Sequence, residues 1–169
     1  EASRSLVATL KSIYSQSAID QVDEIFLVVD GNKIKADVRK KIEHPKLKVV
    51  IRKERSGQSA RINDIFRLAG TDLLILSNDD VIWKPDVIKN IISSYSKNRT
   101  GLMAIKVIPL PGSHLRENVI RISSEISLYV GERWNRGHNY LTCNGRILSI
   151  SRQLYKHIKI PQKIWNNDA

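Results

Sequence analysis

Short apolar runs alternate with stretches of helical periodicity through the first two thirds of the chain. The apolar runs are rich in Val, Ile and Leu and are too short for helices, so they predict buried strands. Between them, apolar residues recur three and four positions apart, as on one face of an amphipathic helix. We therefore expect strands at 22–29, 47–51, 73–76 and 102–108, and helices at 6–16, 34–42, 59–68 and 85–96.

This alternation predicts an α/β fold, because the strands are too apolar to leave one face of a sheet in water. We expect a doubly wound, mostly parallel sheet with helices on both faces. The pattern is less regular beyond residue 108. Residues 119–130 fit a helix or a strand, and a strand at 146–151 leads into a short helix at 152–157. No repeat or linker divides the 169 residues, so we expect one domain.

The charge is concentrated in one segment. Of a formal net charge of +11, residues 33–61 contribute +8, from eleven Lys and Arg against three acidic residues. Such a face favours anionic partners such as nucleotide phosphates, nucleic acid or lipid headgroups, and the alternative is a solvated face that aids solubility. The segment has no aromatic residue on which single-stranded bases could stack, which argues against nucleic acid as a partner. A single cysteine, Cys143, is compatible with a reducing compartment, so we expect a cytoplasmic protein.

Oxygen-bearing side chains follow the apolar run at 73–76. Ser77, Asn78, Asp79 and Asp80 come directly after it, and ligands of open α/β sheets gather at the carboxyl ends of strands. Carboxylate, amide and hydroxyl oxygens are suitable ligands for a hard divalent cation. The alternative is structural, because either aspartate could cap the helix that follows.

Four stretches together resemble the family 2 glycosyltransferases, inverting enzymes of the GT-A fold that take a sugar from a nucleotide donor. These stretches are Val-Val-Asp-Gly-Asn at 28–32, the Gly-containing turn and helix start at 55–63, Ser-Asn-Asp-Asp at 77–80, and Asn-Asp at 167–168. The resemblance covers nearly the whole chain. It implies that residues up to about 108 form the nucleotide-binding part, and that residues 109–169 form the acceptor side.

The resemblance also implies a role for each matching residue. A strand-end carboxylate of the family hydrogen-bonds the nucleotide base or ribose, and the following Gly-containing segment passes close to the nucleotide. The expected nucleotide-binding residues are Asp30, Gly31, Asn32, Arg55, Gly57, Arg61, Asn63, Ser77 and Asn78. Asp30 could also be simply a turn residue, because Asp-Gly after a strand is a strong turn signal.

The metal and the catalytic base follow from the same resemblance. Asp79, with help from Asp80, matches the family's metal-binding position and would hold Mn2+ or Mg2+ against the donor diphosphate. Asp168 matches the general base that activates the acceptor hydroxyl, and a single displacement then inverts the anomeric carbon. The expected partners are a UDP- or GDP-sugar and a glycan or lipid-linked acceptor. The basic helix at 34–42 would give peripheral contact with the cytoplasmic face of a membrane.

The chain departs from the family pattern at three places. Ser77 replaces the first aspartate of the metal motif, and the usual aspartate pair after the strand at 22–29 is reduced to Asp30 followed by glycine. The family's first strand would precede residue 1, so we expect this sequence to be part of a longer domain. Two other functions stay open, a basic nucleic-acid-binding α/β module and a nucleotidyltransferase, which also uses strand-end carboxylates and a metal.

Overall fold

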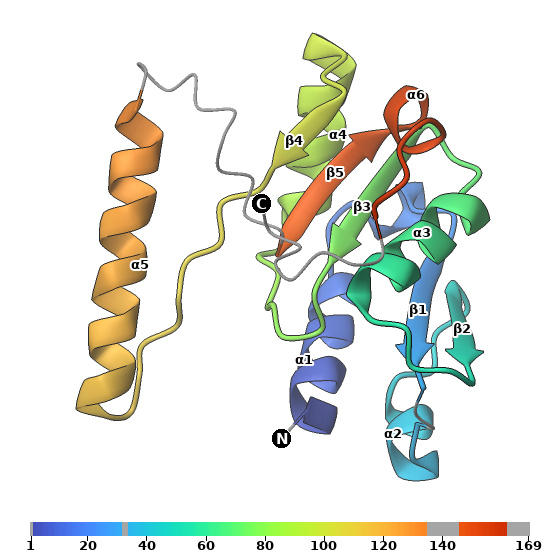
Figure 1. The fold of residues 1–169 in the computed structure, drawn as a ribbon, viewed down its shortest axis with the longest axis horizontal. Helices are drawn as coiled ribbons and strands as arrows, with labels where there is room; N and C mark the ends of the chain where they lie inside the picture. The colour runs from blue at the N-terminus through green and yellow to red at the C-terminus, as the bar shows by residue number, and fades with distance from the viewer. Residues whose placement is uncertain (1, 32–33, 135–145, 162–169) are drawn as a thin grey trace.

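The structure is a computed structural model that describes residues 2–31, 34–134 and 146–161 (Figure 1). The strands in this part of the chain are β1 (Ile25–Asp30), β2 (Leu47–Arg52), β3 (Leu73–Ser77), β4 (Leu102–Ala104) and β5 (Ile147–Ser151). The helices are α1 (Ala2–Tyr14), α2 (Ala36–Lys41), α3 (Gln58–Leu68), α4 (Val87–Asn98), α5 (Leu115–Arg133) and α6 (Arg152–Tyr155), with a 3-10 turn at Ile19–Gln21. None of these helices is long and apolar enough to cross a membrane.

The strands form a parallel pair and an antiparallel triplet. β1 pairs with β2 in parallel, from Ile25 opposite Leu47 to Asp30 opposite Arg52. β5 lies between β3 and β4 and runs antiparallel to both. β1 and β3 point the same way, so their carboxyl ends lie at the same end of the molecule (Figure 1). The functional candidates that follow these two strands are therefore brought to one edge.

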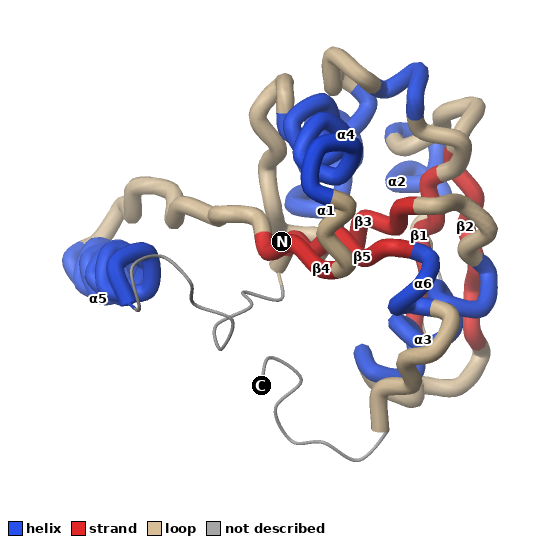
Figure 2. Tube along the Cα trace, turned by 90° about the horizontal axis from the view of Figure 1, so that it is seen from above, coloured by secondary structure: helices blue, strands red, loops and turns tan. Residues whose placement is uncertain are grey.

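Helices cover both faces of the strands, which confirms the expected α/β class. In the view of Figure 2, α1 and α4 lie on one side of β3 and β5, and α3 and α6 lie on the other. The α1 and α4 side packs Trp83 and Ile88 against Ile147, and the opposite side packs Phe66 against Tyr155. β5 is the most buried strand, since four of its five residues are buried. A third cluster joins α1 to α2 and β1.

The arrangement of the fourth strand differs from the prediction. The strand expected at 102–108 ends at Ala104, and its neighbour is the antiparallel β5 and not a parallel strand. An apolar run predicts a buried strand but carries no information on direction or neighbour, because a strand between two others is apolar whichever way it runs. β5 comes from the less regular end of the sequence, so its insertion was not foreseen.

Several element boundaries also differ. The strand expected from residue 22 begins only at Ile25, because the residues before it complete a 3-10 turn in which Val22 N–H donates to Ile19 O. The helix expected at residue 85 begins at Val87. The ambiguous stretch at 119–130 is helical and belongs to α5, which stands apart from the layers in both views (Figures 1 and 2). The Glu117 carboxylate caps α5 by accepting backbone N–H donors before it.

Candidate active site

Asp30, the last residue of β1, anchors the loop between β2 and α3. Its Oδ1 accepts from the Ser56 N–H (2.9 Å) and its Oδ2 accepts from the Gly57 N–H (2.8 Å). Arg61 Nε also donates to Oδ1, at 2.8 Å. The Ser56 hydrogen bond does most to hold the pKa of Asp30 below its ordinary value, and the Gly57 and Arg61 donors add to it. The carboxylate is therefore ionised and fixes the loop at the strand end.

Two glycines make this close approach possible. Gly31 has φ +75°, and a Cβ at this position would lie 2.8 Å from the Cβ of Arg55. Gly57 has φ +84° at the start of α3, in open space. Both positions are in the left-handed region, where a Cβ causes steric strain and glycine, which has none, does not. At Gly31 the close approach of the loop adds a second reason, so that both predicted glycines have a structural explanation.

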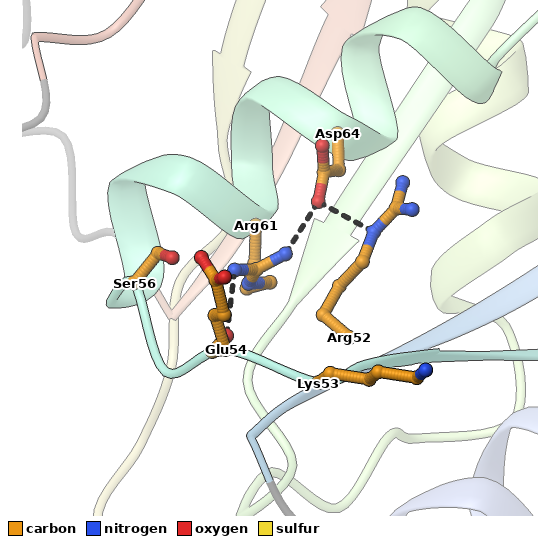
Figure 3. A pocket seen from close by; sticks show the side chains of 6 residues that line it. All are labelled: Arg52, Lys53, Glu54, Ser56, Arg61 and Asp64. Atoms are coloured by element: carbon orange, nitrogen blue, oxygen red, sulfur yellow. Dashed lines mark hydrogen bonds and ion pairs between the residues drawn. The ribbon is translucent and has the colours of Figure 1, made fainter.

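Arg61 connects this anchor to the helix behind it (Figure 3). Its Nη1 donates to Asp64 Oδ2 at 2.7 Å, and its Nη2 donates to the backbone oxygen of Glu54 at 3.1 Å. Arg52 Nε donates to the same Asp64 oxygen at 2.9 Å, and Arg67 donates to Asp64 Oδ1. The Arg61 side chain is only 12% exposed. Three of its five N–H donors are thus committed to protein acceptors.

The buried partner in this network is Asp64, whose side chain is 6% exposed. Burial by itself raises the pKa of a carboxyl group, but the hydrogen bonds from Arg67 and Arg52 more than offset it and hold the pKa of Asp64 below its usual value. Asp64 was not predicted from the sequence. The signal that could have found it is its spacing, three residues after Arg61 and three before Arg67, which places all three side chains on one face of a helix.

A shallow cavity of about 330 Å³ opens beside this network, lined by Arg52, Lys53, Glu54, Ser56, Arg61 and Asp64 (Figure 3). Lys53 and Arg55 are exposed here. Neither forms an ion pair with a carboxylate among residues 2–31, 34–134 and 146–161. Among the described residues of this loop, Lys53 and Arg55 are therefore the cations that remain available to a bound anion.

The turn after β3 forms the second half of the site. The Ser77 hydroxyl donates to the Asn78 carbonyl (2.9 Å) and accepts from the indole N–H of Trp83 (3.2 Å), so it shapes the turn. Gln58 Nε2, in the first turn of α3, lies 3.5 Å from Asn78 Oδ1. This contact brings the turn and the Asp30-anchored loop together. Asp80 pairs with Arg146 at 3.1 Å, and both side chains are about half exposed.

Two polar side chains, one in α1 and one just after it, hold this turn and the segment that follows. The buried Thr9 donates its hydroxyl to the Asp79 carbonyl at 2.9 Å. Gln16, also buried, donates to the Lys84 carbonyl (2.7 Å) and accepts from the Ile88 N–H (3.1 Å). The Asp79 carboxylate itself is exposed at the edge, because α1 holds its backbone rather than its side chain.

The remaining predicted site residues lie elsewhere. Asn63 makes a two-way hydrogen bond with the backbone of Ile160, at 2.7 Å and 2.9 Å, and so fixes the segment after α6. Asn32 and Asp168 are outside the described residues, so their expected roles stay predictions. Among the residues that the structure describes, no group of three or more His, Cys, Asp or Glu side chains could hold a metal ion by itself.

The mixed α/β fold, with polar side chains gathered where two parallel-running strands end, is the arrangement in which open α/β domains bind their ligands. The family model described as glycosyl transferase family 2 matches residues 1–158. The chain therefore belongs to glycosyl transferase family 2, which confirms the family that the sequence resembles.

A solved structure supports the fold. The chain is similar to the mannosyltransferase PcManGT from Pyrobaculum calidifontis, which was solved in complex with GDP-Man and Mn2+, with a TM-score of 0.68 and 19% sequence identity. The similarity covers 98% of this chain and 46% of that protein, so the chain spans about half the length of its structural relative. No curated protein sequence matches the chain significantly. At this identity the likeness establishes the GT-A-like fold.

Proposed function

We propose that this protein transfers a sugar from a nucleotide-diphosphate donor to a hydroxyl acceptor, with inversion, at the carboxyl edge of β1 and β3. One observation carries the proposal. The Asp30-anchored loop and the turn at 77–80 meet at this edge, and Gln58 lies 3.5 Å from Asn78 across them. Membership of glycosyl transferase family 2 and the GDP-Man and Mn2+ complex of the mannosyltransferase relative support it.

The donor nucleotide, a UDP- or GDP-sugar, would bind between these two segments. Asp30 Oδ1 accepts two hydrogen bonds and Oδ2 accepts one, so one lone pair of Oδ2 stays available for a base N–H or ribose hydroxyl. Lys53 and Arg55 are the cations for the diphosphate, because three of the five N–H donors of Arg61 are already used by protein acceptors. Arg61 thus acts as a positioning residue, which fixes the loop relative to the Asp30 carboxylate.

The residues at this edge fit a divalent cation that is shared with the donor. The exposed Asp79 carboxylate supplies one protein ligand, and phosphate oxygens and water would complete the shell, as is common for Mg2+ and related ions. A cation bound there would neutralise charge on the leaving diphosphate. Asp80 would become a second metal ligand only if its ion pair with Arg146 broke. Asp168 is our proposal for the general base, from its place in the family pattern.

The alternative of a nucleic-acid-binding module is weaker in this structure, because many cations of the basic segment are engaged internally. Lys46 donates to three backbone carbonyls, Lys48 pairs with Glu24, and Arg52 pairs with Asp64. The exposed cations of α2 remain available for peripheral contact with anionic lipid at the cytoplasmic face of a membrane. That contact would weaken with salt and with charge removal at Lys40 and Lys41.

Calorimetric titration with UDP and GDP, each with and without Mn2+, tests the proposal. We expect one nucleotide to bind more tightly with Mn2+, and Asp79→Asn to abolish the metal-dependent part. Asp23→Asn is the matched control, because Asp23 is an exposed aspartate in the loop before β1. If the folded protein binds neither nucleotide under any of these conditions, the donor site is wrongly assigned. Equal loss in both variants would show that Asp79 is not the metal ligand.

A further inference from the structure

A second cleft lies at the end of the molecule opposite the nucleotide edge. It has a volume of about 650 Å³ and opens beside Asp72, the residue before β3. Leu73 is opposite Ser151 in the β3–β5 ladder, and Arg152 N–H donates to Asp72 O at 2.8 Å. The five residues of β3 span about 13 Å, so the cleft is well separated from the turn that begins at Ser77.

Cations from two separate elements meet in this cleft. Arg99 caps the end of α4, and Arg152 and Lys156 come from α6 and the residue after it. None of the three forms an ion pair with a carboxylate in the part of the chain that the structure describes. The cleft therefore has three positive charges outside ion pairs and one carboxylate, Asp72, so its lining is net positive. His157 also lines the cleft.

Two of these cations are held in place. Arg99 lies 5.8 Å over the ring of Tyr95, one turn earlier in α4. Its backbone is left-handed (φ 49°, ψ 34°), a conformation that usually selects glycine or asparagine at the end of a helix. Lys156 donates one N–H to the Ala69 carbonyl at 2.8 Å, which leaves two donors. The cleft thus presents positioned donors and not merely mobile surface charges.

We propose that this cleft binds a phosphate ester that carries hydroxyl groups. Guanidinium groups match the geometry of phosphate oxygens, and an ammonium group adds charge, so the three cations select the phosphate. The Asp72 carboxylate would repel a bare anion but accepts hydrogen bonds from hydroxyl groups. Tyr95, Ser151 and Gln153 add neutral polar groups to the same lining. A phosphorylated polyol satisfies both halves of this chemistry, whether it is a soluble metabolite or the headgroup of a lipid.

Amide chemical shifts during titration with glycerol 3-phosphate, with glycerol as the neutral control, test the site. We expect saturable shifts in 95–101 and 151–157 with glycerol 3-phosphate only. Arg99→Gly and Arg152→Gln should each weaken binding about ten-fold, since each removes charge-assisted hydrogen bonds. Glycine suits the left-handed backbone, so Arg99→Gly should fold at least as well as the parent. Lys97→Gln, on an exposed cation of α4 outside the cleft lining, should change nothing.

Sedimentation with phosphatidylcholine vesicles, with and without phosphatidylglycerol, distinguishes a lipid headgroup from a soluble phosphate ester. Vesicle binding that requires phosphatidylglycerol and falls in Arg99→Gly and Arg152→Gln but not in Lys97→Gln would identify a lipid headgroup. Glycerol 3-phosphate binding without such vesicle binding would identify a soluble ester. The proposal is overturned if glycerol binds as well as its phosphate, if the shifts occur only at 52–58, or if neither phosphate probe binds.

Discussion

Replacing Asp64 with asparagine would test the network behind the nucleotide edge most directly. The change keeps the size of the side chain and removes the charge that three arginines share. Arg67 is 75% exposed, so its pair is worth at most about 0.5 kcal/mol. Arg52 is 41% exposed and contributes about 0.5–1 kcal/mol. Arg61 is 12% exposed and cannot regain water, so its hydrogen bond to Asp64 is worth about 1.5–3 kcal/mol.

The asparagine amide can still accept one of these hydrogen bonds, so we expect a loss of about 2–3 kcal/mol in the free energy of unfolding. Urea denaturation followed by circular dichroism measures it, and the loss corresponds to a lower midpoint by about 1–2 M. Arg67→Gln is the control and should cost at most about 0.5 kcal/mol. The pKa of Asp64 is lowered in the folded state, so its contribution is present above about pH 4 and is lost as the pH falls further.

Two results would refute this reasoning. If Asp64→Asn costs less than about 0.5 kcal/mol, the buried carboxylate does not stabilise the fold in the way that its contacts indicate. If Asp64→Asn costs as much in an Arg61→Gln background as in the parent, the two residues are not coupled, because a double-mutant cycle isolates their interaction.

Three further variants test residues that stabilise the structure around the site. Gly31→Ala should destabilise the protein by about 2 kcal/mol or more in the same urea assay, because it combines a positive φ with a clash against Arg55. Gln16→Ala should cost about 2–3 kcal/mol, because it leaves a backbone N–H and a carbonyl of 84–88 without their side-chain partner, and a cost under 0.5 kcal/mol would contradict it. Burial raises the pKa of Tyr14 to about 12, so stability should fall between about pH 10 and pH 12. Tyr14→Phe should show less of this fall than the parent, and equal curves would disprove the assignment.

The order of the elements up to residue 98 could be predicted from the sequence, because each apolar run and each helical period is a local signal. The position of β5 could not, because its pairing joins 147–151 to strands that lie more than forty residues earlier. The apolar runs also do not fix strand length, because β2 and β3 are each one residue longer than expected, whereas β1 and β4 are shorter. The strand expected at 102–108 ends at Ala104, although Ile105 N–H still donates to Ile147 O.

The candidate site was predicted in its location and only partly in its contacts. Strand-end polar residues such as Asp30 and Asp79 identify the edge, since the position of a residue at the end of a strand is visible in the sequence. The partners of Arg61 are not visible, because an arginine in a basic loop can face phosphate or protein equally well. Only the fold shows that Asp30 and Asp64 both accept hydrogen bonds from it.

The alternating chain of charges from Asp30 through Arg61 and Asp64 to Arg52 has a consequence for how a ligand approaches. The charges of these two carboxylates and two guanidinium groups cancel within a few ångströms, so together they contribute little to the long-range electrostatic field of the protein. Of the described residues in this loop, Lys53 and Arg55 then contribute most of the attraction that a dissolved diphosphate experiences at this edge. The encounter rate should consequently depend on ionic strength as for a small positive patch, and much less than the +11 of the whole chain suggests.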